Sequence, residues 1–358
     1  MSALLYGQIY IISFFAITLL LFSQALLKTK YNEKYYLTHP VLLSLLLLFL
    51  LALYFAYSPI ELPSDKENYR IFFLFFLDDQ VTFTDIGWPL YVEFIREFTS
   101  NELLFFFITA CIYISGYCVF IKKYIPPNYF FYFLVACCAS FGFYSYGTNT
   151  IRSGIALSFL LTAFALKDKR ILFFIFVLIA AMFHKSMLIP AAVFFSAFYI
   201  RHARFYLLIW ILVFFISYVD IPGVGFFIQE TFDDVDSRII SYISGPVAPD
   251  YKVGFRWDFV IYSVLHIIYG LYYMADKGFD DPFYRQIFNT YVGVNAVWLL
   301  MIRVPYTDRF AYLSWFLIPF ILLYPVIKSD SGSFKNIQIG LIISLIAFFN
   351  LSIDVLFK

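Results

Sequence analysis

Four arginines stand at or near the ends of long apolar segments, where a guanidinium can reach an anion at the edge of the hydrophobic stretch. They are Arg152, Arg256, Arg303 and Arg309. The planar guanidinium fork matches two phosphate oxygens at once and stays charged. The pattern therefore predicts a site for a phosphate or pyrophosphate group. The simpler interpretation of any one of these residues is an arginine whose stem lies along apolar surface while its charge reaches water.

Two of these arginines follow residues that are typical of helix starts. Thr148-Asn149-Thr150-Ile151 precedes Arg152, and Pro305-Tyr306-Thr307-Asp308 precedes Arg309. The free backbone N–H groups and the dipole at a helix N-terminus favour an anion, and an arginine there adds a full charge. We therefore expect both arginines in the first turn of a helix. A capped helix with a solvated arginine is the alternative.

Residues able to accept a proton accompany the arginines. The candidates are His184, Asp65, Asp258 and Asp308. Imidazole titrates near neutral pH, and a positioned carboxylate can serve as a general base. Glu67 and Asp85 are further acidic residues on the same expected side. A structural histidine and a helix-capping Asp65 are the simpler interpretations, and the sequence leaves the choice of base open.

Composition and spacing exclude several classes of site. The net charge of +1 gives no electrostatic basis for binding nucleic acid. The four cysteines lie in apolar segments, and no His or Cys cluster has the spacing of metal ligands. We therefore expect no metal, no cofactor and no nucleic-acid partner.

The elements that position these residues are membrane-spanning helices. The 358-residue chain is 62% hydrophobic and 14% charged, whereas soluble domains carry roughly 45–50% apolar and about 25% charged residues. Backbone polar groups in lipid must be satisfied within a segment, so long apolar runs predict helices. We expect an all-α polytopic membrane protein, one transmembrane domain over 1–358, with eleven or twelve passes. The expected spans are 3–27, 41–57, 103–121, 129–146, 150–166, 171–184, 185–200, 205–219, 259–275, 287–302, 310–327 and 337–356.

Charge predicts the orientation. One set of alternate loops holds fourteen of the 25 Lys and Arg residues but only six of the 24 Asp and Glu residues. The positive-inside rule assigns these loops to the cytoplasm, so both termini and the four arginines face outward. This holds only if 171–200 forms two short passes that meet near His184, as in a re-entrant hairpin.

Two long segments, 58–102 and 220–258, are expected on the outer face. In the first, Ser64 and Glu67 fit a capping box, and an apolar helical face follows. That face comprises Tyr91, Phe94, Ile95 and Phe98. In the second, apolar residues recur at spacings of four and three from Ile228 to Tyr242. Both patterns are typical of amphipathic helices that lie on a membrane.

Taken together, the motifs resemble the EpsG-like branch of the Wzy family of polysaccharide (O-antigen) polymerases. Five stretches carry the resemblance in order along most of the chain. They are Asp65-x-x-x-Tyr69, Gly87-Trp88-Pro89-Leu90, Asn149-Thr150-Ile151-Arg152-Ser153-Gly154-Ile155-Ala156, Phe183-His184-Lys185-Ser186 and Asp308-Arg309-x-x-Tyr312. Each stretch alone is weakly specific, whereas the ordered set is more specific.

The resemblance implies a metal-independent glycosyltransferase of the GT-C kind in the bacterial cytoplasmic membrane. Such an enzyme would polymerise undecaprenyl-pyrophosphate-linked oligosaccharide repeats at the outer face. The four arginines would bind the departing pyrophosphate, and one of the four proton acceptors would activate the attacking sugar hydroxyl. The bilayer and lipid-linked glycans are the implied partners, together with a chain-length regulator as a candidate.

Three alternatives stay open at this point. An O-antigen ligase would cleave the same lipid-linked pyrophosphate but transfer the glycan to a lipopolysaccharide core. A flippase or transporter would need charged residues deep within several spans, whereas here they gather at the span edges. A scaffold in polysaccharide assembly would affect chain length but not polymerisation itself.

Overall fold

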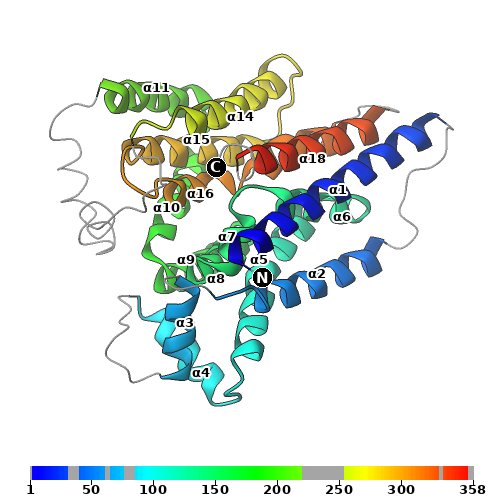
Figure 1. Ribbon diagram of the computed structural model, residues 1–358. Coiled ribbons are helices and arrows are strands. Elements are labelled where there is room, and N and C mark those ends of the chain that lie inside the picture. Colours follow the sequence, from blue (N-terminus) through cyan, green and yellow to red (C-terminus); the bar gives the residue numbers. More distant parts are fainter. Residues whose placement is uncertain are drawn as a thin grey trace. The chain divides into compact units, whose positions relative to one another are not determined.

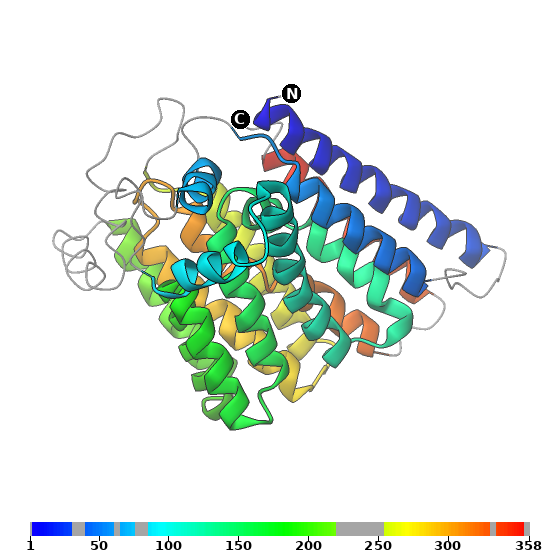
Figure 2. The ribbon, with the colours of Figure 1, turned by 90° about the horizontal axis from the view of Figure 1, so that it is seen from below.

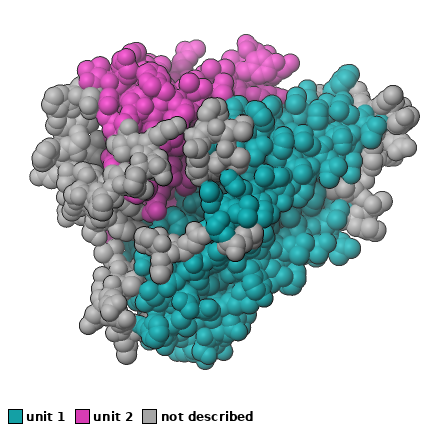
Figure 3. Space-filling view, in the orientation of Figure 1, with its two compact units in different colours: residues 1–184, 326–358 teal, residues 185–325 magenta. Residues whose placement is uncertain are grey.

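The chain folds into helices that form two compact units. The computed structural model describes residues 2–30, 40–60, 65–75, 85–219, 254–329 and 334–353, and no strand occurs among them. Unit 1 comprises 1–184 and 326–358, and unit 2 comprises 185–325 (Figure 3). The expected all-α polytopic class is confirmed. The single domain expected over the whole chain stays a prediction.

Unit 1 joins the two ends of the chain. Its helices are α1 (Ala3–Lys30), α2 (Pro40–Ala56), α3 (Asp65–Leu74), α4 (Gly87–Arg96), α5 (Glu102–Tyr124), α6 (Phe130–Ala139), α7 (Phe143–Thr148), α8 (Ile151–Ala165), α9 (Arg170–Phe183) and α18 (Lys335–Leu351). The first helix packs along the last, α1 against α18 (Figures 1 and 2). Helix α2 packs against α5, α5 packs against α8, and α8 packs against α9. A buried hydrogen bond of 2.6 Å from the hydroxyl of Ser158 on α8 to the carbonyl of Ile112 fixes α8 against α5.

Unit 2 is built around one buried helix. Its helices are α10 (Leu188–Tyr199), α11 (Ala203–Val219), α14 (Trp257–Ala275), α15 (Pro282–Leu300), α16 (Asp308–Trp315) and most of α17 (Ile318–Lys328). The central helix α15 packs against α10, α11, α14 and α16. Its Asn295 accepts a hydrogen bond from the Trp210 indole at 2.8 Å and donates to the hydroxyls of Ser263 and Ser314 at 3.0 and 3.1 Å. Because a buried amide must be satisfied, this network fixes the register of four helices.

Most expected spans coincide with one helix, but two of them are broken. The expected span 129–146 ends as α6 at Ala139, and α7 begins at Phe143 after Gly142, whose φ is 90°. That left-handed conformation favours glycine and interrupts a helix. The expected span 310–327 divides into α16 and α17. Pro319 stands at the second position of α17, where its missing N–H is tolerated.

Four helical stretches have the length and hydropathy to cross a membrane. They are Ala3–Leu27, Glu102–Tyr124, Trp257–Ala275 and Asp308–Lys328. Seven shorter apolar helices of 10–17 residues accompany them among the described residues. The break expected within 171–200 is present, since α9 ends at Phe183 and α10 begins at Leu188. The exact number of passes, the orientation and the re-entrant hairpin stay predictions.

The segment 58–102 contains the two short helices α3 and α4. The buried residues of α4 are Gly87, Trp88, Val92 and Ile95, whereas Phe94 and, just beyond the helix, Phe98 are 57% and 72% exposed. Apolar residues thus cover two faces of α4, and the expected face, which begins at Tyr91, did not include Trp88. Its placement on a membrane stays a prediction. Ser64 of the expected capping box and the apolar series from 228 to 242 lie outside the described residues.

Candidate functional site

Arg152 forms a buried ion pair in unit 1. It stands in the first turn of α8, as expected, and its Nη1 lies 2.8 Å from Oδ2 of Asp85. Only 2% of the Arg152 side chain and 3% of the Asp85 side chain are exposed. Each charge would be costly to bury alone, so the two depend on each other. The structure therefore gives Arg152 a protein carboxylate as its counter-ion at the start of a helix.

Glycine brings Asp85 to this position. Gly87 opens α4, and a Cβ on it would lie 2.8 Å from the carbonyl carbon and oxygen of Met182 in α9. Only a residue without a side chain permits this approach of α4 to the end of α9. The adjacent Trp88 is fully buried, with its ring 4.7 Å from that of Tyr69. Tyr91 lies one turn further along α4, and its ring centre is 6.0 Å from that of Phe183.

Three of the five stretches that carry the resemblance thus meet in unit 1. The stretch from Asp65 supplies Tyr69, the glycine-tryptophan stretch supplies Gly87 and Trp88, and the end of α9 supplies Phe183. A fourth stretch includes Arg152, whose ion-pair partner Asp85 stands two residues before Gly87.

Replacing Gly87 by alanine is expected to destabilise unit 1. The added Cβ meets backbone atoms, which cannot rotate away, so α4 must shift from α9 at a cost of about 1–3 kcal/mol. Denaturant or thermal unfolding in detergent measures the loss. Gly7→Ala is the matched control, because its Cβ meets only the Tyr144 ring at 3.2 Å. Equal unfolding midpoints for Gly87→Ala and Gly7→Ala would contradict the close packing of α4 on α9.

The two proton-acceptor candidates of unit 1 lie at helix ends. His184 follows the last residue of α9, and its backbone N–H bonds to the carbonyl of Ala180 at 2.9 Å. It is half-buried and stands two residues after Met182, where α4 approaches. Asp65 is the first residue of α3 and is also half-buried. Both roles stay predictions.

Arg256 and Asp258 form a two-point ion pair in unit 2. The Nε and Nη2 atoms of Arg256 lie 2.9 and 2.5 Å from the two carboxylate oxygens of Asp258. The same guanidinium stacks on the ring of Phe259, 3.6 Å from its centre. Both oxygens of the Asp258 carboxylate therefore face the guanidinium of Arg256.

Arg303 reaches the same region from the end of α15. Its Nε and Nη2 donate hydrogen bonds of 3.3 and 3.2 Å to the carbonyls of Ser217 and Tyr218 at the end of α11. Its guanidinium lies 5.5 Å from the centre of the Phe255 ring. Phe255 directly precedes Arg256 in the chain, whereas the Arg256 guanidinium itself stacks on Phe259.

A fixed corner between α15 and α16 carries Arg303 and Arg309. The Trp298 indole donates a 2.9 Å hydrogen bond to the Thr307 hydroxyl, which in turn donates to the carbonyl of Met301 at 2.8 Å. Tyr306 has a φ of 59°, an uncommon conformation for a residue other than glycine. Beyond this corner α16 begins at Asp308, as expected from the sequence, with Arg309 in its first turn. Arg309 lies 5.5 Å from the ring of Tyr306.

Comparison with known protein families assigns the chain. The model of the EpsG family matches residues 41–355, which is most of the sequence. The chain belongs to the EpsG family. The expected resemblance is therefore confirmed, and membership points to a membrane polysaccharide polymerase of the glycosyltransferase type. No curated protein and no solved structure matches the chain.

Sequence reasoning missed two buried residues of this EpsG-family chain. Asp85 was one acid among several, and nothing near it in sequence marks it as the partner of Arg152. Lys66 is 2% exposed and bonds chiefly to backbone carbonyls at and just beyond the end of α2. Every residue carries a carbonyl, so no residue type could have signalled this contact.

Proposed function

We propose that this EpsG-family protein polymerises undecaprenyl-pyrophosphate-linked oligosaccharide repeats at the outer face of the bacterial cytoplasmic membrane. Family membership supports a polysaccharide polymerase. The observation that carries the finer proposal is that Arg303 lies against Phe255, the residue directly before Arg256, and that the corner after Arg303 leads into Arg309 at the start of α16. Guanidinium groups gathered at helix ends are suited to a diphosphate.

In the proposed reaction a sugar hydroxyl of one lipid-linked repeat attacks the anomeric carbon of the growing glycan. A carbon–oxygen bond forms, the bond to the pyrophosphate breaks, and undecaprenyl pyrophosphate leaves. Negative charge develops on the leaving group, and donors held in place in advance stabilise it most effectively. Arg256, Arg303 and Arg309 would supply that charge without a metal.

We favour Asp308 as the base that takes the proton of the attacking hydroxyl. It shares the first turn of α16 with Arg309, one of the residues proposed to bind the pyrophosphate. Asp65 and His184 remain the candidates from unit 1.

Arg152 is a separate candidate within unit 1. In the structure its counter-ion is Asp85. Its expected role in binding pyrophosphate stays a prediction, supported by its place at a helix start, which favours anions.

Reconstitution of the purified protein with lipid-linked repeats as the only substrate tests the proposal. A polymerase yields a ladder of products on a gel, each one repeat longer than the last. An O-antigen ligase yields no ladder until a separate acceptor is added, and then a single transfer. Absence of a ladder from active, folded protein would remove the polymerase assignment.

A further inference from the structure

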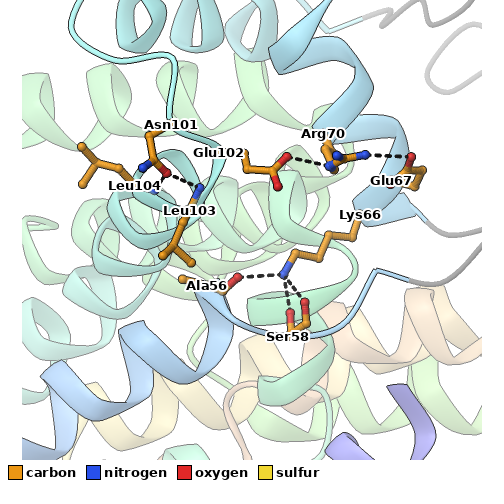
Figure 4. A network of polar contacts seen from close by, with 9 residues as sticks. All are labelled: Ala56, Ser58, Lys66, Glu67, Arg70, Asn101, Glu102, Leu103 and Leu104. Atoms are coloured by element: carbon orange, nitrogen blue, oxygen red, sulfur yellow. Dashed lines mark hydrogen bonds and ion pairs between the residues drawn. The ribbon is translucent and has the colours of Figure 1, made fainter. Parts of the chain in front are cut away.

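The short helix α3 carries a buried lysine that caps another helix. Lys66 is 2% exposed, and its Nζ lies 3.2 Å from each carbonyl oxygen of Phe55 and Ala56 at the end of α2. The carbonyl and hydroxyl oxygens of Ser58 lie 2.8 and 2.5 Å away (Figure 4). The last carbonyls of a helix have no partner within it and carry the negative end of its dipole. The amine therefore satisfies groups that the α2 end leaves open.

One turn later, α3 carries a second cation that reaches a different helix. The Nε of Arg70 donates to Oε2 of Glu102 at 2.6 Å, and Nη1 of Arg70 lies 3.4 Å from Glu67 (Figure 4). Glu102 stands in the first turn of α5, directly after its N-cap residue Asn101. Lys66 and Arg70 thus join α3 to the end of α2 and to the start of α5.

The position of α3 matters to the buried site of unit 1 through aromatic contacts. The ring centres of Tyr69 and Trp88 lie 4.7 Å apart, and Phe73 stacks on Phe105 with ring centres 4.3 Å apart. Trp88 stands three residues after Asp85, the partner of Arg152. A displacement of α3 would therefore remove packing from the segment that holds this ion pair.

We propose that Lys66 is a positioning residue, whose amine fastens α3 to the end of α2 and so holds the Tyr69–Trp88 contact beside the Asp85–Arg152 pair. The positioning role rests on the polymerisation proposed above, whereas the fastening of α3 does not. Lys66 itself contacts backbone carbonyls and the ring of Phe106, not the substrate.

Oxygen acceptors surround the amine of Lys66. Four oxygens, from Phe55, Ala56 and Ser58, lie within 3.2 Å of Nζ, and the protonated amine has three N–H donors to offer them. Burial lowers the pKa of Lys66 from 10.5 to about 7, and the charge of Glu102 on α5 opposes that effect. The hydrogen bonds of the amine therefore fasten α3 to the end of α2.

Hydrogen exchange of peptide 65–75, corrected for the intrinsic exchange rate, tests the fastening. The variant is Lys66→Met, which keeps the stem and removes the amine. Lys277→Met is the matched control, because Lys277 is exposed and lies near the Tyr272 ring. We expect the same protection in wild type and control, and less protection in Lys66→Met. Reconstituted with lipid-linked repeats, Lys66→Met should also give shorter glycans than the control.

Wild-type protection in Lys66→Met would overturn the fastening. Lost protection with unchanged glycan length would overturn the positioning role. If wild type forms no polymer while the exchange results hold, the proposed function fails and the fastening of α3 stands.

Discussion

Replacing either Arg152 or Asp85 by alanine is expected to lower the free energy of unfolding by about 3–5 kcal/mol, because the remaining charge is buried without its partner. The two side chains are 2% and 3% exposed and lie 2.8 Å apart. Unfolding in detergent measures the loss. Arg285→Ala is the control, since Arg285 pairs with a largely exposed Asp280. An exposed pair contributes about 0–1 kcal/mol.

The double variant Arg152→Met with Asp85→Leu separates structure from chemistry. Replacing a buried ion pair by apolar residues of similar volume is often neutral for stability. We therefore expect a folded protein that no longer makes long glycans, because the guanidinium proposed to bind the pyrophosphate is gone. A stable double variant with full polymerisation would leave Arg152 a purely structural residue.

Arg303→Ala and Arg309→Ala are expected to reduce the polymerisation rate by about 10²-fold or more, which is the usual cost of removing one donor to developing charge. Both proteins should still assemble in membranes. Lysine should restore little, because it loses the fork that can bind two oxygens. Initial rates of repeat addition in vesicles measure the effect.

Arg201→Ala is the matched control for Arg303. Its Nε also donates to a helix-end carbonyl, that of Phe198 at 3.4 Å, but charge assigns it to the cytoplasmic side. It should polymerise at the wild-type rate. Equal rates for Arg201→Ala, Arg303→Ala and Arg309→Ala would refute a special role for the corner between α15 and α16.

Local signals in the sequence predicted the helices and their starts well. Polar residues before Arg152 and Asp308 indicated helix N-termini, and α8 and α16 begin at Ile151 and Asp308. Helix starts depend on neighbouring residues, so the sequence contains a signal for them, although neither Thr150 nor Thr307 makes a side-chain cap hydrogen bond. The break at Gly142 had a local signal as well, but the apolar residues on both sides predicted one continuous span.

Contacts between distant residues could not be predicted in the same way. Asp85 reaches Arg152 only because α4 packs on the end of α9 through Gly87. Lys66 finds backbone carbonyls, which carry no residue-specific signal. The bidentate pair of Arg256 with Asp258 lies two residues apart, yet the sequence left open whether Asp258 binds a sugar, accepts a proton or pairs with its neighbour.

Binding of a short-chain polyprenyl pyrophosphate to the purified protein tests the central claim most directly, since it needs no turnover. The arginine account predicts tighter binding of the pyrophosphate than of the matching monophosphate. It also predicts an affinity at least about tenfold weaker in Arg303→Lys and Arg309→Lys, but unchanged in Arg201→Lys. Equal affinity for both ligands, or the same affinity in all three variants, would contradict the claim that these guanidinium groups hold the leaving diphosphate.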